Sequence, residues 1–152
     1  MKLLKSFAYA LRGIITCLRL ERNFRIHITA VVTVLIFAHL YQLPLTQYPP
    51  ILLVMALVLG LEAVNTALEQ TVDLVTKEQS LQARIAKDVS AAAVFIAALG
   101  AVAIAVVTFS DPERWMTVFT CFQSPMAVIG LVVYILFFLA FIFQFKTKEE
   151  TI

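Results

Sequence analysis

The chain has 152 residues, of which 61% are hydrophobic and 14% are charged. A soluble domain is about 25% charged, so the composition and the long apolar runs exclude an ordinary soluble protein and predict an integral membrane protein. The net charge is +2, and the basic residues are not arranged as the basic face of a soluble protein, which argues against a nucleic-acid partner. Two cysteines in unrelated segments, Cys17 and Cys121, argue against a disulfide framework.

An amphipathic helix is expected at residues 2–20. Basic side chains interrupt the segment, so it does not have the uninterrupted apolar region of a cleavable signal peptide. A helix with one apolar and one basic face lies in the headgroup plane of a membrane, and we prefer this to a helix in a soluble core. The apolar face would hold Leu3, Leu4, Phe7, Leu11, Ile14, Ile15 and Leu18, and the polar face Lys2, Lys5, Arg12, Thr16 and Arg19.

Four membrane-spanning helices are predicted after this segment. Their approximate ranges are 26–43, 51–75, 85–109 and 126–145. Each approaches or exceeds the ~20 residues that a helix needs to cross the hydrocarbon. Prolines mark the connections at Pro44, at Pro49 and Pro50, and at Pro112 and Pro125. The fold class is therefore an all-α membrane bundle with a surface helix at its N-terminus.

The basic residues divide unevenly between the two sides of this bundle. Eleven of the 12 Lys and Arg residues fall in the N-terminal segment, in and around the loop between the second and third spans, or in the tail; Arg114 alone falls on the opposite side. Positive charge accumulates in cytoplasmic loops. We therefore expect both termini to be cytoplasmic, which agrees with an even number of spans.

The second span carries polar residues at helical spacing. Glu62, Asn65, Glu69 and Asp73 follow one another at steps of three, four and four, which places them on one stripe of a helix. The span enters from the outer side at Ile51, so the stripe occupies its inner half. Ionisable groups inside a membrane helix are costly and usually serve function.

Other polar residues are expected at the same side of the membrane. Glu21 precedes the first span, and Lys87 and Asp88 open the third. Such a set has the components of phosphoryl transfer, because carboxylates hold Mg²⁺, a lysine neutralises phosphate charge, and a further carboxylate can accept a hydroxyl proton. The chain has no glycine-rich phosphate loop.

Each of these groups also has a purely structural interpretation. Glu62 could be a neutral acid that is hydrogen-bonded within its helix, and Glu69 or Asp73 could form salt bridges with Lys87 or Arg84. The charges of Glu21, Lys87 and Asp88 could simply be solvated at the interface or complement a helix end.

Two motifs in register resemble the signature of the prokaryotic diacylglycerol kinase/undecaprenol kinase family. They are Glu62-Ala-Val-Asn65-Thr66-Ala-Leu-Glu69-Gln-Thr-Val-Asp73 and Ala86-Lys87-Asp88-Val-Ser-Ala-Ala-Ala-Val94. Upstream, Glu21-Arg-Asn-Phe-Arg-Ile-His27 and Phe7-Ala-Tyr9-Ala-Leu-Arg12-Gly13 resemble the Gram-positive branch. The resemblance covers about residues 2–109.

This resemblance implies a homotrimeric kinase of the bacterial plasma membrane that phosphorylates a lipid alcohol from MgATP among membrane lipids. Residues 1–109 would form the kinase domain, with a surface helix and three spans, and residues 110–152 an extension with a fourth span. The resemblance implies that Glu62 is the general base and that Glu21 and Glu69 bind the metal, with Asn65 beside them. It implies that Lys87 and Asp88 contact the nucleotide and that Tyr9 and Glu78 make weaker contacts with it. Asp73 would belong to the same polar belt.

The substrate is expected to be undecaprenol. Ala91 stands where the branch that uses diacylglycerol carries a serine, with Ser90 one position earlier, and the resemblance to the Gram-positive branch favours the polyprenol. A diacylglycerol kinase that makes phosphatidic acid is the alternative within the family. A small ion-coupled transport protein would spread polar groups through the bilayer, and a membrane scaffold would need no convergent carboxylates.

Overall fold

The computed structural model describes residues 2–76 and 80–143, and this part of the chain is helical without any strand. The predicted all-α fold is confirmed. The helices are α1 (Lys2–Leu20), α2 (Arg22–Leu40), α3 (Tyr48–Val75), α4 (Leu81–Thr108), α5 (Pro112–Cys121) and α6 (Pro125–Phe143), with a 3₁₀ turn, η1, at Leu45–Gln47.

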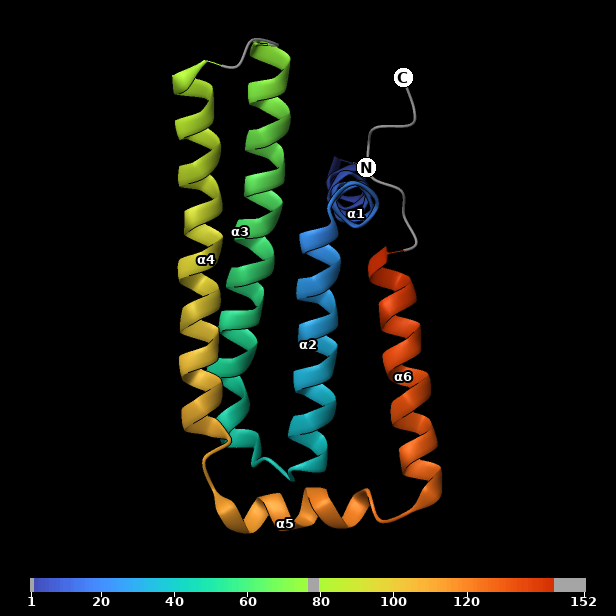
Figure 1. Ribbon diagram of the computed structural model, residues 1–152. Helices are drawn as coiled ribbons and strands as arrows, with labels where there is room; N and C mark the ends of the chain where they lie inside the picture. The colour runs from blue at the N-terminus through green and yellow to red at the C-terminus, as the bar shows by residue number, and fades with distance from the viewer. Residues whose placement is uncertain (1, 77–79, 144–152) are drawn as a thin grey trace.

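Four of these helices, α2, α3, α4 and α6, run side by side, and the two others lie across the ends of the bundle (Figure 1). In the described part of the chain, the same four are long and apolar enough to cross a membrane, as predicted. Helix α1 lies across the end where α2 begins, and α5 lies across the opposite end, so we name these the Glu21 end and the Tyr41 end. Helices α3 and α4 extend past α1 at the Glu21 end (Figure 1).

Local sequence sets where the long helices begin. Prolines stand in the first turn of α3, where an absent backbone N–H costs no hydrogen bond. Helix α4 begins after Ser80, whose side chain accepts a hydrogen bond from the backbone N–H of Ala83 at 3.1 Å. The chain turns from α1 into α2 at Glu21, whose backbone is extended with φ −110° and ψ 116°. Glu21 therefore lies at the corner between the surface helix and the first span.

The sequence predicts only a connection between the third and fourth spans, and the structure corrects this prediction. Residues Pro112–Cys121 form α5. Asp111 caps the helix, since its carboxylate accepts the Glu113 N–H at 3.0 Å, and Pro112 occupies the first turn. Asp-Pro-Glu is a helix-start signal, but ten residues are too few to stand out among runs of 20 or more apolar residues.

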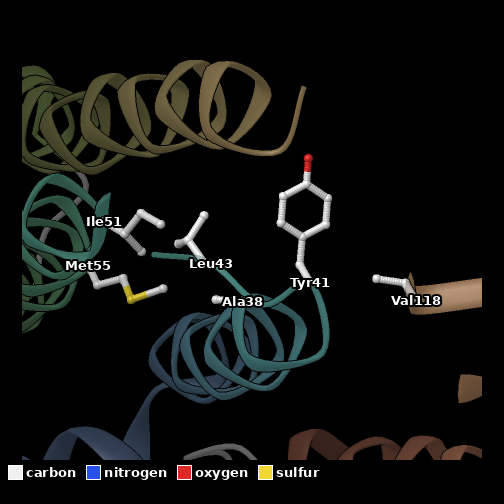
Figure 2. Packing of buried hydrophobic residues seen from close by; sticks show 6 residues of the cluster. All are labelled: Ala38, Tyr41, Leu43, Ile51, Met55 and Val118. Carbon is white, nitrogen blue, oxygen red and sulfur yellow. The ribbon is translucent and has the colours of Figure 1, made fainter. Parts of the chain in front are cut away.

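Helix α5 packs against the end of α2 through a buried cluster (Figure 2). Tyr41 is fully buried and lies between Ala38 and Val118 in Figure 2. Its hydroxyl donates to the Asp111 carbonyl and accepts from the Asp111 N–H, both at 2.8 Å. Its ring packs edge-on against Phe109 and Trp115. These contacts join α5 to α2. The cluster consists of Ala38, Tyr41, Leu43, Ile51, Met55 and Val118.

We expect Tyr41→Phe to lower the free energy of unfolding by about 1–2 kcal/mol, because the ring packing stays while the Asp111 backbone loses its partner. Unfolding in detergent micelles by titration with a denaturing detergent measures this. Tyr48→Phe is the matched control, since Tyr48 is half-buried and begins α3 at the same end. Equal stability of the two variants would contradict the role given to the Tyr41 hydroxyl.

Candidate active site

The polar stripe of α3 runs from a buried to an exposed position. Glu62 is 2% exposed and Asn65 is 8% exposed, whereas Glu69 is half-buried and Asp73 is exposed. The Asn65 amide donates to the Glu69 carboxylate at 3.0 Å, as expected for residues four apart on one helix face. The stripe therefore presents one deep carboxylate and a series of more accessible polar groups toward the Glu21 end.

Helix α4 supplies partners to this stripe. The Ser90 hydroxyl donates to the Asn65 side-chain oxygen at 2.6 Å, and the Lys87 ammonium pairs with the Asp73 carboxylate at 2.6 Å. Asn65 thus connects α4 to Glu69. Because Lys87 and Asp73 are both partly exposed, water screens their attraction, and the ion pair contributes little to the stability of the fold. This pair is the salt bridge between Asp73 and Lys87 that the sequence offered as a purely structural alternative. The pair also shows that Lys87 lies beside the stripe.

Ser90 was not among the predicted site residues. It entered the sequence analysis only as the neighbour of Ala91, yet it links the two helices. Helical spacing could have identified it, because Ser90 lies three residues after Lys87 and therefore on the same face of α4. Its hydroxyl also lies 2.9 Å from the Lys87 carbonyl.

Two predicted site residues in the described part of the chain, Asp88 and Tyr9, make other contacts. Asp88 is exposed and pairs with Arg84 along α4 at 3.6 Å. Tyr9 is exposed on α1, with the Arg12 guanidinium 5.8 Å from its ring centre. Glu78 lies outside the described residues. Their proposed contacts with nucleotide therefore stay predictions.

The corner at Glu21 approaches the stripe of α3. Cys17, in the last turn of α1, is buried and interacts with the Thr66 hydroxyl. Burial raises the pKa of the Cys17 thiol, and the nearby charges of Glu21 and Glu62 raise it further. Glu62 in turn lies within electrostatic range of both Glu21 and Glu69. The corner at Glu21 and the buried end of the stripe therefore lie near each other.

The donor set suits Mg²⁺ only in part. Among the residues that the structure describes, no three acidic, histidine or cysteine side chains are close enough to hold an ion together. Mg²⁺ in proteins is commonly held by one or two carboxylates, with water and phosphate oxygens completing its coordination. Carboxylates that repel one another also favour a bound cation. The metal-binding roles of Glu21 and Glu69 therefore stay predictions.

Comparison with known proteins assigns a class to this arrangement. A model of the family "Prokaryotic diacylglycerol kinase" matches residues 8–109. Over 95 residues the chain is 42% identical to the undecaprenol kinase of Bacillus subtilis, which covers 62% of this chain and 77% of that protein. Over 103 residues it is 42% identical to the diacylglycerol kinase of Synechocystis sp., which covers 67% of this chain and 59% of that protein. No solved structure matches with significance.

These matches, with the apolar bundle and its polar stripe, define a membrane lipid kinase. The family model covers two thirds of the sequence and includes every described residue of the stripe. The chain belongs to the prokaryotic diacylglycerol kinase family. Helices α5 and α6 lie beyond the matched residues.

We expect Ser90→Ala to lower the rate of phosphate transfer about 3- to 10-fold, the loss that one hydrogen bond produces. Without the Ser90 hydroxyl, Asn65 loses the contact that fixes its amide toward Glu69. Transfer of labelled γ-phosphate to lipid alcohol measures the rate. Ser110→Ala is the control, because the Ser110 hydroxyl is exposed at the Tyr41 end and donates to the Val107 carbonyl of its own helix end. A normal rate for Ser90→Ala would show that the link to α4 is not needed.

Proposed function

We propose that this protein transfers the γ-phosphate of ATP to the hydroxyl of undecaprenol and so makes undecaprenyl phosphate. The observation that carries this proposal is the buried Glu62 carboxylate, which lies next to a polar network that becomes more exposed toward the Glu21 end. A lipid alcohol can reach a buried base from the bilayer while a nucleotide approaches from water. The membership of the family supports the reaction type.

Glu62 is proposed as the general base. Its carboxylate would take the proton of the lipid hydroxyl as the hydroxyl oxygen forms a bond to the γ-phosphorus. The bond between this phosphorus and the β–γ bridging oxygen would break in line, and ADP would leave with that oxygen. Helix α1 is amphipathic and marks the expected headgroup level, and its Cys17 lies beside Glu62 and Thr66. Glu62 would therefore meet a hydroxyl held at the lipid headgroup.

Glu21 and Glu69 are proposed to hold Mg²⁺, which when bound neutralises phosphate charge. Asn65 would keep the Glu69 carboxylate oriented, since it donates to that group from a fixed place beside Ser90. Lys87 would add positive charge to the phosphates, with Asp73 holding its ammonium near the stripe. Asp88, Tyr9 and Glu78 are proposed as further nucleotide contacts on the resemblance alone.

A homotrimer in the bacterial plasma membrane, with both termini in the cytoplasm, completes this proposal. The distribution of Lys and Arg supports the orientation. In that orientation the Glu21 end faces the cytoplasm, where ATP is available, and α3 and α4 extend past the surface helix on that side (Figure 1). The pair of Lys87 and Asp73 then lies toward water.

The choice of undecaprenol depends on Ala91 and on the Gram-positive character of the motifs. The match to the Bacillus protein supports it, and the match to the Synechocystis protein supports the alternative, diacylglycerol. Membership of a lipid kinase family leaves the ion-coupled transporter and the scaffold without support.

We expect undecaprenol to be used with a kcat/KM at least about 10-fold above that of diacylglycerol, a difference of about 1.4 kcal/mol in transition-state binding. Purified protein in mixed micelles, labelled γ-phosphate and a panel of lipid alcohols measure this. A preference for diacylglycerol would assign the alternative substrate. No transfer to any lipid alcohol would contradict the proposed function.

We expect Glu62→Gln to reduce phosphate transfer by about 10²- to 10⁴-fold, because the amide cannot accept the hydroxyl proton. The folded bundle should persist, since glutamine keeps the shape and polarity of the side chain, and thermal unfolding in detergent checks this. Glu113→Gln is the matched control on α5 at the Tyr41 end, where the glutamate is exposed. Normal turnover of a folded Glu62→Gln protein would remove the proposed base.

A further inference from the structure

Helix α6 lies beyond the part of the chain that matches the family and packs mainly against α2. The two helices stand side by side, with α2 between α3 and α6 (Figure 1). Three polar or aromatic contacts fix them together. The hydroxyls of Thr33 and Tyr134 are 2.6 Å apart, and the Arg22 guanidinium lies 5.5 Å from the ring centre of Phe143. The third contact is made by Arg25.

Arg25 is 1% exposed, although it carries a positive charge in a membrane-spanning helix. Its Nε donates to the Ile142 carbonyl of α6 at 3.2 Å. Its Nη1 donates to the carbonyls of Leu18 and Arg19, in the last turn of α1, at 2.9 and 3.4 Å. Carbonyls at a helix C-terminus lack partners within the helix and attract positive charge. One guanidinium thus joins α1, α2 and α6.

Glu21 lies next to these contacts. It is the single residue between α1 and α2, and the Arg25 backbone N–H donates to its carbonyl at 3.4 Å. The Arg25 guanidinium holds the turn of α1 just before Glu21 and lies within electrostatic range of the Glu21 carboxylate. The direction in which Glu21 points therefore depends on where the Arg25 guanidinium is held.

We propose that Arg25 is a positioning residue for Glu21, and that α6 is the support that keeps Arg25 in place. The fourth span then acts as a brace for the proposed metal-binding corner, although it carries no acidic or basic side chain in its described residues. This inference rests on one part of the proposed function, the binding of metal by Glu21. Loss of the Ile142 acceptor would leave Nε to find another partner at membrane depth, where few are available.

Two variants separate the arginine from its support. Arg25→Lys keeps the charge but lacks the planar set of donors that reaches two helices. Tyr134→Phe combined with Phe143→Ala weakens the contact of α6 with α2 and leaves Arg25 unchanged. Arg19→Lys is the control, because the Arg19 side chain is exposed on α1. All are made in the full chain with Cys121→Ser, which removes the exposed cysteine.

The first measurement is the rate at which a maleimide labels Cys17. This cysteine lies in the last turn of α1 and is only 6% exposed. Its labelling rate therefore reports how often the corner opens, and the measurement does not require phosphate transfer. The second is the binding of Mn²⁺ with a non-hydrolysable ATP analogue, followed by electron paramagnetic resonance, with Glu21→Gln as the reference for a lost ligand. We expect Arg25→Lys and the α6 variant to speed labelling and weaken Mn²⁺ binding, each by about 5-fold or more, while Arg19→Lys changes neither.

Several outcomes would overturn the inference. One is an α6 variant with normal labelling of Cys17 and normal Mn²⁺ binding. If Arg25→Lys does not fold, the α6 variant alone tests the inference. Another is faster labelling with unchanged Mn²⁺ binding, which would give Arg25 a structural role only. A third is unchanged Mn²⁺ binding in Glu21→Gln. If the predicted changes occur but the wild-type protein phosphorylates no lipid alcohol, the inference holds and the proposed function fails.

Discussion

The hydrogen bond between Ser90 and Asn65 connects the two halves of the candidate site. Polar groups within apolar helices need partners from the protein, because the bilayer offers none. In this chain Asn65 accepts from α4 with its oxygen and donates to Glu69 with its nitrogen, so both ends of one amide are used. That arrangement fixes how α3 and α4 are rotated against each other. The Lys87–Asp73 pair follows from the same rotation, closer to the ends of the helices.

Exposure increases along α3 from Glu62 to Asp73, which suits a lipid kinase, because its two substrates come from the bilayer and from water. Glu62 is buried beside the end of the surface helix, while Asp73 and Lys87 lie farther along helices that extend past α1. The acceptor of such an enzyme keeps its tail in the bilayer, and the phosphate donor is dissolved in water. A single helix that passes from one medium to the other can therefore hold the proposed base and the proposed phosphate-binding groups in sequence.

The features that could be predicted from the sequence are those set by the spacing of residues within one helix. The stripe of α3, the N-terminal amphipathic helix and the four spans were predicted from local spacing and hydropathy. The structure confirms that these segments are helical and that four of them are long and apolar enough to cross a membrane. Contacts between helices depend on their rotation, which spacing does not give. Asp88 follows Lys87 directly, yet each residue turns a helix by about 100°, and Asp88 points away from the stripe toward Arg84. The partners of Ser90 and Arg25 likewise lie on other helices.

Among residues 110–143, which the structure describes, no carboxylate joins the candidate site, and the contacts of α5 and α6 are concentrated on α2. At the Tyr41 end, α5 binds α2 through Tyr41 and Asp111, and the Arg114 side chain donates to the Gln42 carbonyl. At the Glu21 end, α6 binds α2 through Arg25. Helix α2 is thereby held at both ends. Since the stripe lies on α3 and its partners on α4, the extension can reach the chemistry mainly through α2. Among the predicted site residues, the one directly joined to α2 is Glu21.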